Sequence, residues 1–312
     1  IMAGDNFHHV RDFPFFELPL SIGVDLAEWF AGDPSVHVSP GSTGIPLPGI
    51  EIAGHYHYLT KFVVLQFVAG LLTFVIFRGL ARRVGSGEPT TGRFWNLWEA
   101  IALFVRDEIV RPTIGDGHHD HGDGDHGHRE DASVGHHADQ YLPFLWTCFF
   151  FVLFCNLLGA VPMLGSPTGN LGVTGALAGA VFLYNVIQGS KQFGVWGFWK
   201  NQCPDLGLSG VQGVVITAIL WPIEVVGLFI KHGVLAVRLF ANIMGGHTVV
   251  GVMLGFIAAD GVAGTWLQGV VTPLSILGQV GIGMLELFVA FLQAYVFTYL
   301  STIFLSTCLH EH

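Results

Sequence analysis

The stretch KHGVLAVRLFANIMGGHTVV, residues 231–250, places Arg238 deep inside a segment that is otherwise suited to hydrocarbon. An arginine stays protonated at essentially any pH and is costly at bilayer depth. An intramembrane arginine therefore normally faces a partner, a water-filled cavity or an ion path. This one residue predicts a membrane helix with a function beyond anchoring.

The composition supports a membrane protein. Of the 312 residues, 51% are apolar and only 12% are charged, which lies well outside the average for soluble proteins. The 42 glycines and long uncharged runs favour closely packed helices over the alternating segments of a membrane β-barrel. The net charge of −10 argues against a nucleic-acid partner, and the four scattered cysteines indicate neither a disulfide framework nor a zinc site. We therefore expect an all-α integral membrane protein.

The amino-terminal part of the chain predicts an arm followed by one membrane crossing. Residues 1–57 are rich in Pro, Gly and His and contain no stretch long enough to span, so we expect an extramembrane arm. Residues 58–84 predict the first transmembrane helix. Three arginines close it, and by the positive-inside tendency they put its end in the cytoplasm and the amino terminus outside. These are Arg78, Arg82 and Arg83.

Two segments that do not cross the membrane follow. Residues 92–112 place apolar side chains on one helical stripe and charges off it, which predicts an amphipathic surface helix with Trp95 and Trp98 at headgroup level. Residues 115–140 hold seven histidines among acids and glycines. Their irregular spacing favours a flexible, solvated loop, and a metal site there is the alternative.

The remainder predicts four more membrane helices, five in all. Residues 141–190 form a transmembrane hairpin, followed by Lys191 and Lys200 on the cytoplasmic side. Residues 205–307 form two helices too long for a perpendicular crossing, so we expect both to be strongly tilted and to form an ion path. The carboxyl terminus then lies in the cytoplasm.

Titratable groups recur along these last two helices. Glu224, Lys231 and Arg238 are seven residues apart and share one helical stripe, which Asn242 continues, while His247 points to the other side. In the last helix Glu286 and Gln293 are also seven residues apart and share a face. Glu286 and His247 could meet across the interface of the two helices. Simpler readings exist: Glu224 could pair with Lys231, His247 and Gln293 could serve in packing, and Arg238 could be a neutralised structural charge. Their combination favours a proton path through the membrane.

Several stretches resemble subunit a of the F-type ATP synthase membrane sector. The resemblance is carried by PIEVVGLFIKHGVLAVRLFANIMGGHTVVGVML (222–254) and LELFVAFLQAYVFTYLSTIFLS (285–306). Weaker matches are HHVRDFPFFELP (8–19), GRFWNLWEAIALFVRDEIVRP (92–112) and PFLWTCFFFVLFCNLLGAVP (143–162). The RLFAN core with a glutamine in LQAYVF is the specific signal. The similarity covers nearly the whole chain apart from the histidine-rich insert and parts of the arm.

The resemblance implies a non-catalytic stator subunit in a bacterial inner membrane, without cofactor or metal, beside a rotating c-subunit ring and peripheral-stalk b subunits. Arg238 would face the rotor carboxylate between two offset half-channels. By matching position, Asn242, His247, Glu286 and Gln293 would belong to the outer access path, and Glu224 to the cytoplasmic exit. Lys231, Asn156 and Asn170 are possible supporting residues.

This chain departs from the family pattern at some positions. It carries the acid and the imidazole of positions 247 and 286 the other way round from many bacterial members, which keeps a paired relay. His232 stands where proline is frequent and Gly159 replaces a polar residue of some members, so neither receives a role. Two other functions stay open: a sodium-translocating version of the same subunit, and, from a different class, a metal-ion transporter fed by the histidine-rich loop.

Overall fold

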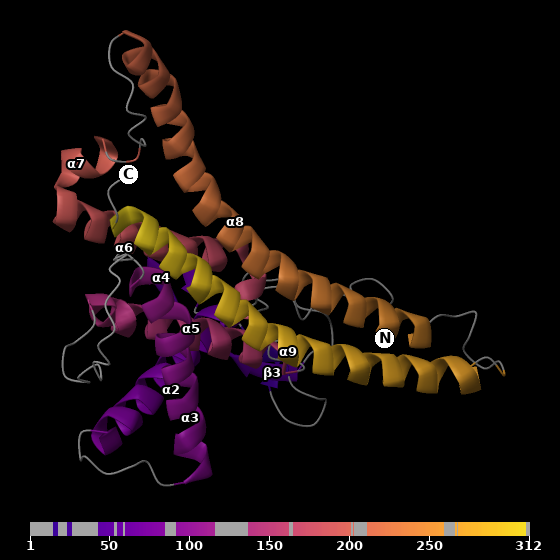
Figure 1. Cartoon of the computed structure of the whole chain (residues 1–312). Coiled ribbons are helices and arrows are strands. Elements are labelled where there is room, and N and C mark those ends of the chain that lie inside the picture. Colours follow the sequence, from indigo (N-terminus) through magenta and orange to yellow (C-terminus); the bar gives the residue numbers. More distant parts are fainter. Residues whose placement is uncertain are drawn as a thin grey trace. The chain divides into compact units, whose positions relative to one another are not determined.

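The computed structural model is mostly helical (Figure 1). It describes residues 15–17, 24–26, 43–52, 55–58, 60–84, 92–115, 137–161, 165–200, 202, 211–258, 266 and 268–309. The chain divides into two compact units, and the long helices contribute residues to both. The first unit comprises residues 1–73, 151–174 and 238–293, and the second comprises residues 74–150, 175–237 and 294–312.

The long helices are α2 (Lys61–Val84), α5 (Leu142–Gly159), α6 (Leu171–Phe193), α8 (Val211–Ala258) and α9 (Gln268–Leu309). Shorter helical elements are α3 (Arg93–Phe104), η2 (Val105–Val110), α4 (Arg111–Gly115), η3 (His137–Tyr141), η4 (Pro167–Gly169) and α7 (Val195–Lys200). The sequences of the five long helices are apolar on nearly all sides, which is the pattern of helices surrounded by lipid or protein.

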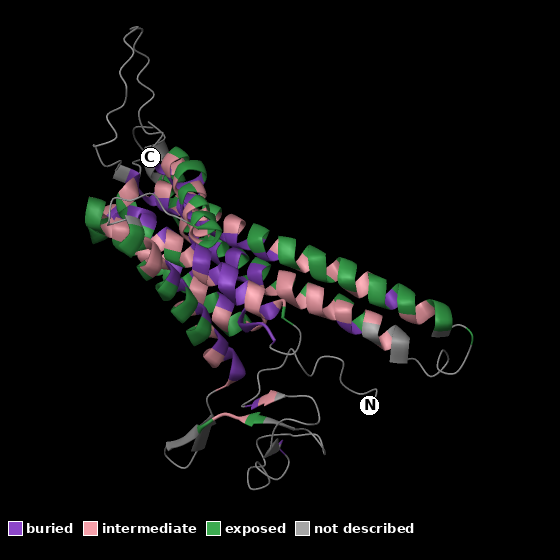
Figure 2. Ribbon diagram, turned by 90° about the horizontal axis from the view of Figure 1, so that it is seen from below, coloured by how far each residue is buried: buried purple, intermediate pink, exposed green. Residues whose placement is uncertain are grey.

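Among the described residues, four stretches are long and apolar enough to cross a membrane. They are Lys61–Arg83, Ala138–Gly159, Leu171–Phe193 and Gly269–Leu309. Large apolar side chains such as Phe67, Leu71 and Phe74 on α2 are exposed in the isolated chain, as lipid-facing residues would be. Figure 2 shows that exposed positions recur along the helices. An integral membrane protein built on α-helices is thus confirmed. Helix α8, which carries Glu224 and Arg238, is not among these four stretches.

Five short strands lie in the amino-terminal arm and were not predicted. They are β1 (Phe15–Glu17), β2 (Val24–Asp25), β3 (Thr43–Pro46), β4 (Gly49–Ile52) and β5 (His55–Tyr58). β3 lies between β1 and β2 and is antiparallel to both, and β4 pairs with β5 in a second antiparallel sheet. Strands of two to four residues carry too few alternating positions to stand out in a Pro- and Gly-rich sequence.

The predicted surface helix is a composite within the second unit. A π-helical turn, η2, joins α3 to α4, and it buries Val105 and Ile109 completely. The indole N–H of Trp146 on α5 donates to the carbonyl of Ala102 at 2.9 Å. Gly79 on α2 lets the ring of Trp95 lie against the helix backbone, because an added Cβ would overlap that ring. The apolar stripe therefore packs on α2 and α5 over part of its length.

Charged residues at the end of this segment form ion pairs. Arg106 donates from Nε to Asp107 Oδ1 at 2.8 Å, and this bond and charge, with the charge of Arg111, hold the pKa of Asp107 below its ordinary value. Arg111 also binds both carboxylate oxygens of Asp139 in η3, at 3.1 and 2.9 Å. The histidine-rich residues 116–136 lie outside the described residues, and this bidentate pair joins the elements on either side of them.

Candidate functional site

Helices α8 and α9 run antiparallel within the first unit. Two close approaches establish the direction: the side chain of Glu286 lies against Gly246, and the sulfur of Met253 lies beside Gly278, 3.6 Å from where a Cβ would stand. Moving forward along α8 from Gly246 to Met253 thus means moving backward along α9. Figure 1 shows these two stretches side by side. The arrangement brings together residues that are 25 to 40 positions apart in sequence.

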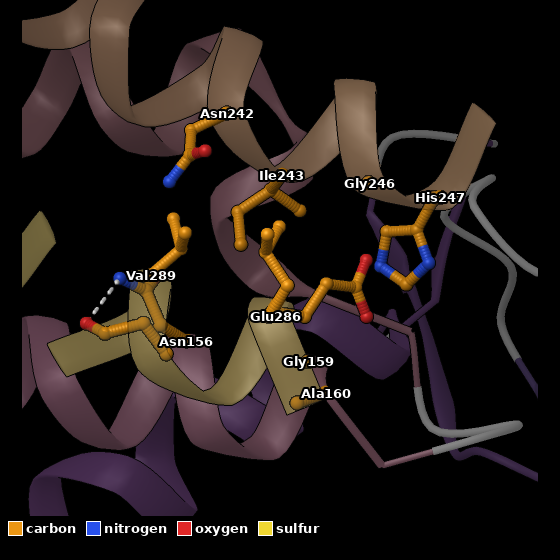
Figure 3. A pocket seen from close by; sticks show the side chains of 11 residues that line it. Asn156, Gly159, Ala160, Asn242, Ile243, Gly246, His247, Glu286 and Val289 are labelled. Carbon is orange, nitrogen blue, oxygen red and sulfur yellow. Dashed lines mark hydrogen bonds between the residues drawn. The ribbon is translucent and has the colours of Figure 1, made fainter. Parts of the chain in front are cut away.

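A cavity of about 80 Å³ lies in the first unit where α5, α8 and α9 meet. This volume exceeds the roughly 10–15 Å³ that one water needs, so the cavity has room for several waters. Its polar members offer those waters hydrogen-bond partners. The lining comprises Asn156 and Gly159 from α5 with Ala160 directly after it, Asn242, Ile243, Gly246 and His247 from α8, and Leu285, Glu286, Val289 and Ala290 from α9 (Figure 3).

The carboxylate of Glu286 and the imidazole of His247 face one another across this cavity (Figure 3). Glu286 reaches α8 because Gly246 has no side chain: a Cβ built there would overlap Oε1 and stand only 3.0 Å from Cδ. A carboxylate beside an imidazole can exchange protons near neutral pH. Sequence reasoning brought the acid and the histidine together but missed Gly246. Its only signal is the Gly-Gly pair directly before His247.

Asn156 forms the α5 side of the cavity and is almost completely buried. Its Nδ2 donates to the carbonyl of Ala290 on α9 at 3.5 Å, and its Oδ1 accepts from the hydroxyl of Thr168 at 3.0 Å. The hydroxyls of Thr168 and Ser166 are 2.8 Å apart. Sequence reasoning missed both hydroxyl residues, which lie in the turn between α5 and α6.

Two of the predicted site residues have a buried amide nitrogen that lacks a hydrogen-bond partner among the described residues. They are Nδ2 of Asn242, in the cavity wall, and Nε2 of Gln293, whose side chain is only 3% exposed. A buried amide without a partner is costly, and ordered water usually supplies the missing bond. Both therefore mark places where water or a group from outside this chain would be bound.

Arg238 is exposed, and it forms no hydrogen bond or ion pair with any described residue. It lies in the first unit, nine residues before His247 on the same helix. Glu224 and Lys231 lie in the second unit and form no ion pair with each other. No ion pair among the described residues therefore neutralises these charges.

His232, which received no predicted role, is buried in the second unit. Its Nδ1 is 2.9 Å from the carbonyl of Leu228, and its Nε2 is 3.3 Å from Nδ2 of Asn185 on α6. Since a carbonyl only accepts, Nδ1 carries the proton and Nε2 accepts from the amide. The rings of Phe182 and Phe304 pack against the imidazole. The contacts are those of a histidine that joins three helices.

Two other predictions concern Asn170 and the cysteines. Asn170 accepts a hydrogen bond from the backbone N–H of Gly172 at 2.8 Å, which caps the start of α6. Cys148, Cys155 and Cys308 are free thiols. Among the described residues no three His, Cys, Asp or Glu side chains gather as a metal site.

Comparison with known proteins gives one family. The family model described as ATP synthase A chain matches residues 129–306. The chain belongs to the ATP synthase A chain family. Curated relatives include the ATP synthase subunit a of Myxococcus xanthus, 34% identical over 97% of this chain and 88% of the relative. The subunit a of Chloroherpeton thalassium is 33% identical over 86% of this chain and 72% of the relative.

Membership of the ATP synthase A chain family confirms the resemblance drawn from the RLFAN and LQAYVF motifs. The matched range of the ATP synthase A chain model contains every residue that lines the cavity. It also contains Arg238 and Glu224. Members of this family are non-catalytic membrane subunits, which agrees with the prediction of a chain without a catalytic site of its own. The bacterial relatives and the spanning helices agree with a multi-pass protein of the bacterial inner membrane.

Proposed function

We propose that this chain is the proton-translocating stator subunit of a rotary ATP synthase. The observation that carries the proposal is the cavity, large enough for several waters, in which the carboxylate of Glu286 faces the imidazole of His247 between apolar helices. Titratable groups inside a membrane domain normally mark an ion or proton pathway. The family supplies the assembly in which such a pathway drives rotation.

Arg238 provides the fixed cation that the pathway requires. It is exposed on α8 without a partner among the described residues, so its working partner is expected on another chain: the carboxylate of the c-subunit ring. A cation that cannot lose its proton keeps that carboxylate ionised as it passes and blocks a direct proton leak. Each charge that crosses 100 mV carries about 2.3 kcal/mol, which such a leak would waste.

The pathway then consists of two offset half-channels. In the outer one His247 and Glu286 exchange protons, Asn242 and Gln293 hold water near the arginine, and Asn156 supports α9. Glu224 stands at the cytoplasmic exit, with Lys231 as a supporting cation. Asn170, as the cap of α6, contributes only to the shape of the access path.

The membrane arrangement follows from helix lengths and charges. Helices α8 and α9 have 48 and 42 residues, so at 1.5 Å per residue each is roughly twice as long as a 30 Å hydrocarbon core. Strong tilt keeps them within the bilayer. With α8 added to the four apolar stretches, the chain has five membrane-inserted helices. Arg82 and Arg83 in the last turn of α2 put that end in the cytoplasm and the amino terminus outside. The chain assembles with other ATP synthase subunits, with the c ring and the peripheral-stalk b subunits as neighbours.

Protons are the preferred ion because an imidazole next to a carboxylate titrates near neutral pH. A sodium-translocating version would pump at a rate that depends on added sodium, whereas the proton machine does not need it. A metal-ion transporter would depend on the histidine-rich segment. Deleting residues 116–138 is expected to leave proton-driven ATP synthesis intact, and metal transport would be lost if that alternative held.

Inverted membrane vesicles that contain the whole ATP synthase test the proposal. Arg238→Ala is expected to abolish ATP-driven proton pumping while the complex still assembles. Arg78→Ala is the matched control, since it removes an exposed arginine at the end of α2 and should pump normally. Coupled pumping by Arg238→Ala vesicles at the rate of the parent complex would refute the proposal.

A further inference from the structure

We propose that Ser166 and Thr168 form, with Asn156, a hydrogen-bonded network that positions Glu286 in the proton path. The inference rests on the proposed function and adds Ser166 and Thr168, which lie outside the cavity lining. All three side chains are polar and almost fully buried, with 2%, 1% and 1% of their surfaces exposed. Buried polar side chains need hydrogen-bond partners, and these three, which lie together in an apolar domain, supply them to one another.

Gly159 makes the network possible. A Cβ at this position would overlap the hydroxyl of Ser166 and stand 2.5 Å from its Cβ. The side chain of Ser166 therefore occupies the space that a side chain at position 159 would otherwise fill. Gly159 itself lines the cavity, so the hydroxyl of Ser166 lies directly behind the cavity wall.

The direction of the hydrogen bonds follows from the last acceptor. The carbonyl of Ala290 can only accept, so the amide nitrogen of Asn156 faces it and the amide oxygen faces Thr168. Thr168 must then donate to Asn156, and with its proton committed it must accept from Ser166. The three hydrogen bonds of this network all run from donor to acceptor in the direction of α9, and hydrogen bonds aligned in this way strengthen one another.

The network acts on the helical turn that carries Glu286. Ala290 is four residues after Glu286 and thus one turn along α9, so the bond from Asn156 holds this turn against α5. The titratable groups that line the cavity are Glu286 on α9 and His247 on α8. The residues of the α5 side of the lining are not titratable. Arg238 is nine residues before His247 on α8, so helical periodicity puts the two on opposite faces of that helix. Ser166 and Thr168 are therefore positioning residues for the proton exchange between Glu286 and His247.

The first test replaces Thr168 by valine in the whole complex. Thr168→Val keeps the shape but leaves the buried oxygen of Asn156 without its donor. We expect ATP-driven proton pumping per assembled complex to fall about fivefold, the net worth of one hydrogen bond, and its pH dependence to shift. Thr168→Ser should restore both. The matched control is Thr174→Val, since Thr174 is equally buried but its hydroxyl bonds only to the carbonyl of Leu171.

The second test moves the hydroxyl across its contact with Gly159. Gly159→Ser alone should impair pumping because its side chain overlaps Ser166, and the double variant Gly159→Ser/Ser166→Gly should recover it. The inference is overturned if Thr168→Val keeps the parental rate and pH profile, or if the double variant is no better than Gly159→Ser. If Thr168→Val prevents assembly, the double variant decides. Parental behaviour of Thr168→Val while Arg238→Ala abolishes pumping would refute the network and leave the proposed function standing.

Discussion

Substitution of Gly246 by alanine separates the stability of the chain from its transport activity. An added Cβ would overlap Oε1 of Glu286 and stand 3.0 and 3.2 Å from its Cδ and Cγ, whereas ordinary contact begins at 3.4 Å. The carboxylate must therefore retreat from α8 and from the imidazole of His247. A displacement of this kind, about 1 Å, can lower the rate of a positioned reaction by about 10²-fold. Alanine meanwhile favours the helix over glycine by about 1 kcal/mol.

We therefore expect Gly246→Ala complexes to assemble and to resist heat as well as the parent, while ATP-driven proton pumping falls by about one to two orders of magnitude. Pumping is measured by quenching of a pH-sensitive dye in inverted vesicles and is normalised to the amount of assembled complex. Gly179→Ala on α6 is the matched control, because its added Cβ meets nothing within 4 Å. Parental pumping by Gly246→Ala would refute the contact between Glu286 and α8 as a requirement for transport.

Three further predictions concern the second unit. Gly189→Ala places a Cβ 2.5 Å from the ring of Phe198, and this overpacking should lower the free energy of unfolding by about 1 to 2 kcal/mol in thermal unfolding of the purified subunit. Asn185→Leu leaves the buried Nε2 of His232 without its donor and should cost about 1 to 3 kcal/mol in the same assay. Asp107→Asn should lower the melting temperature at pH 7, and this deficit should shrink progressively as the pH falls below about 4. The reason is that the depressed pKa of Asp107 stabilises the fold above its unfolded value, and this contribution is lost as the pH falls through the folded value.

Gly179→Ala should melt no lower than the parent, and equal melting of Gly189→Ala would show that the ring moves away freely. Undiminished stability of Asn185→Leu would mean that water replaces the amide at the imidazole. Glu108→Gln, at an exposed carboxylate without an ion pair among the described residues, should show no pH-dependent difference. A deficit of Asp107→Asn that is as large in acid as at pH 7 would refute the electrostatic origin.

Much of the fold was predictable because hydrocarbon imposes a simple requirement. A helix that crosses it needs about 20 apolar residues. The sequence predicts five membrane-inserted helices, and four stretches of the described residues have the length and hydropathy to cross. The strands of the arm and the π-helical turn in the surface segment were not predicted. Both depend on a few local hydrogen bonds that leave no periodic signal in the sequence.

The candidate site divides in the same way. The seven-residue spacing of Glu286 and Gln293 and the position of His247 could be read from helical periodicity, and their family was evident in RLFAN and LQAYVF. That Glu286 meets His247 depends on the register of two antiparallel helices, which periodicity alone does not specify. Likewise nothing in the spacing of Gly159 and Ser166 indicates that one vacates the space that the other fills.

The sequence by itself therefore determined that this chain is a membrane protein, that it belongs to the ATP synthase A chain family, and that Arg238 stands inside an apolar segment. It could do so because apolar length, charge placement and a specific motif are properties of the chain in order. Only the tertiary structure decided which groups share the cavity, that Gly246 admits the carboxylate of Glu286, and that Ser166 and Thr168 reach Asn156. Those facts depend on close approach between segments remote in sequence, where the absence of a side chain matters as much as its presence.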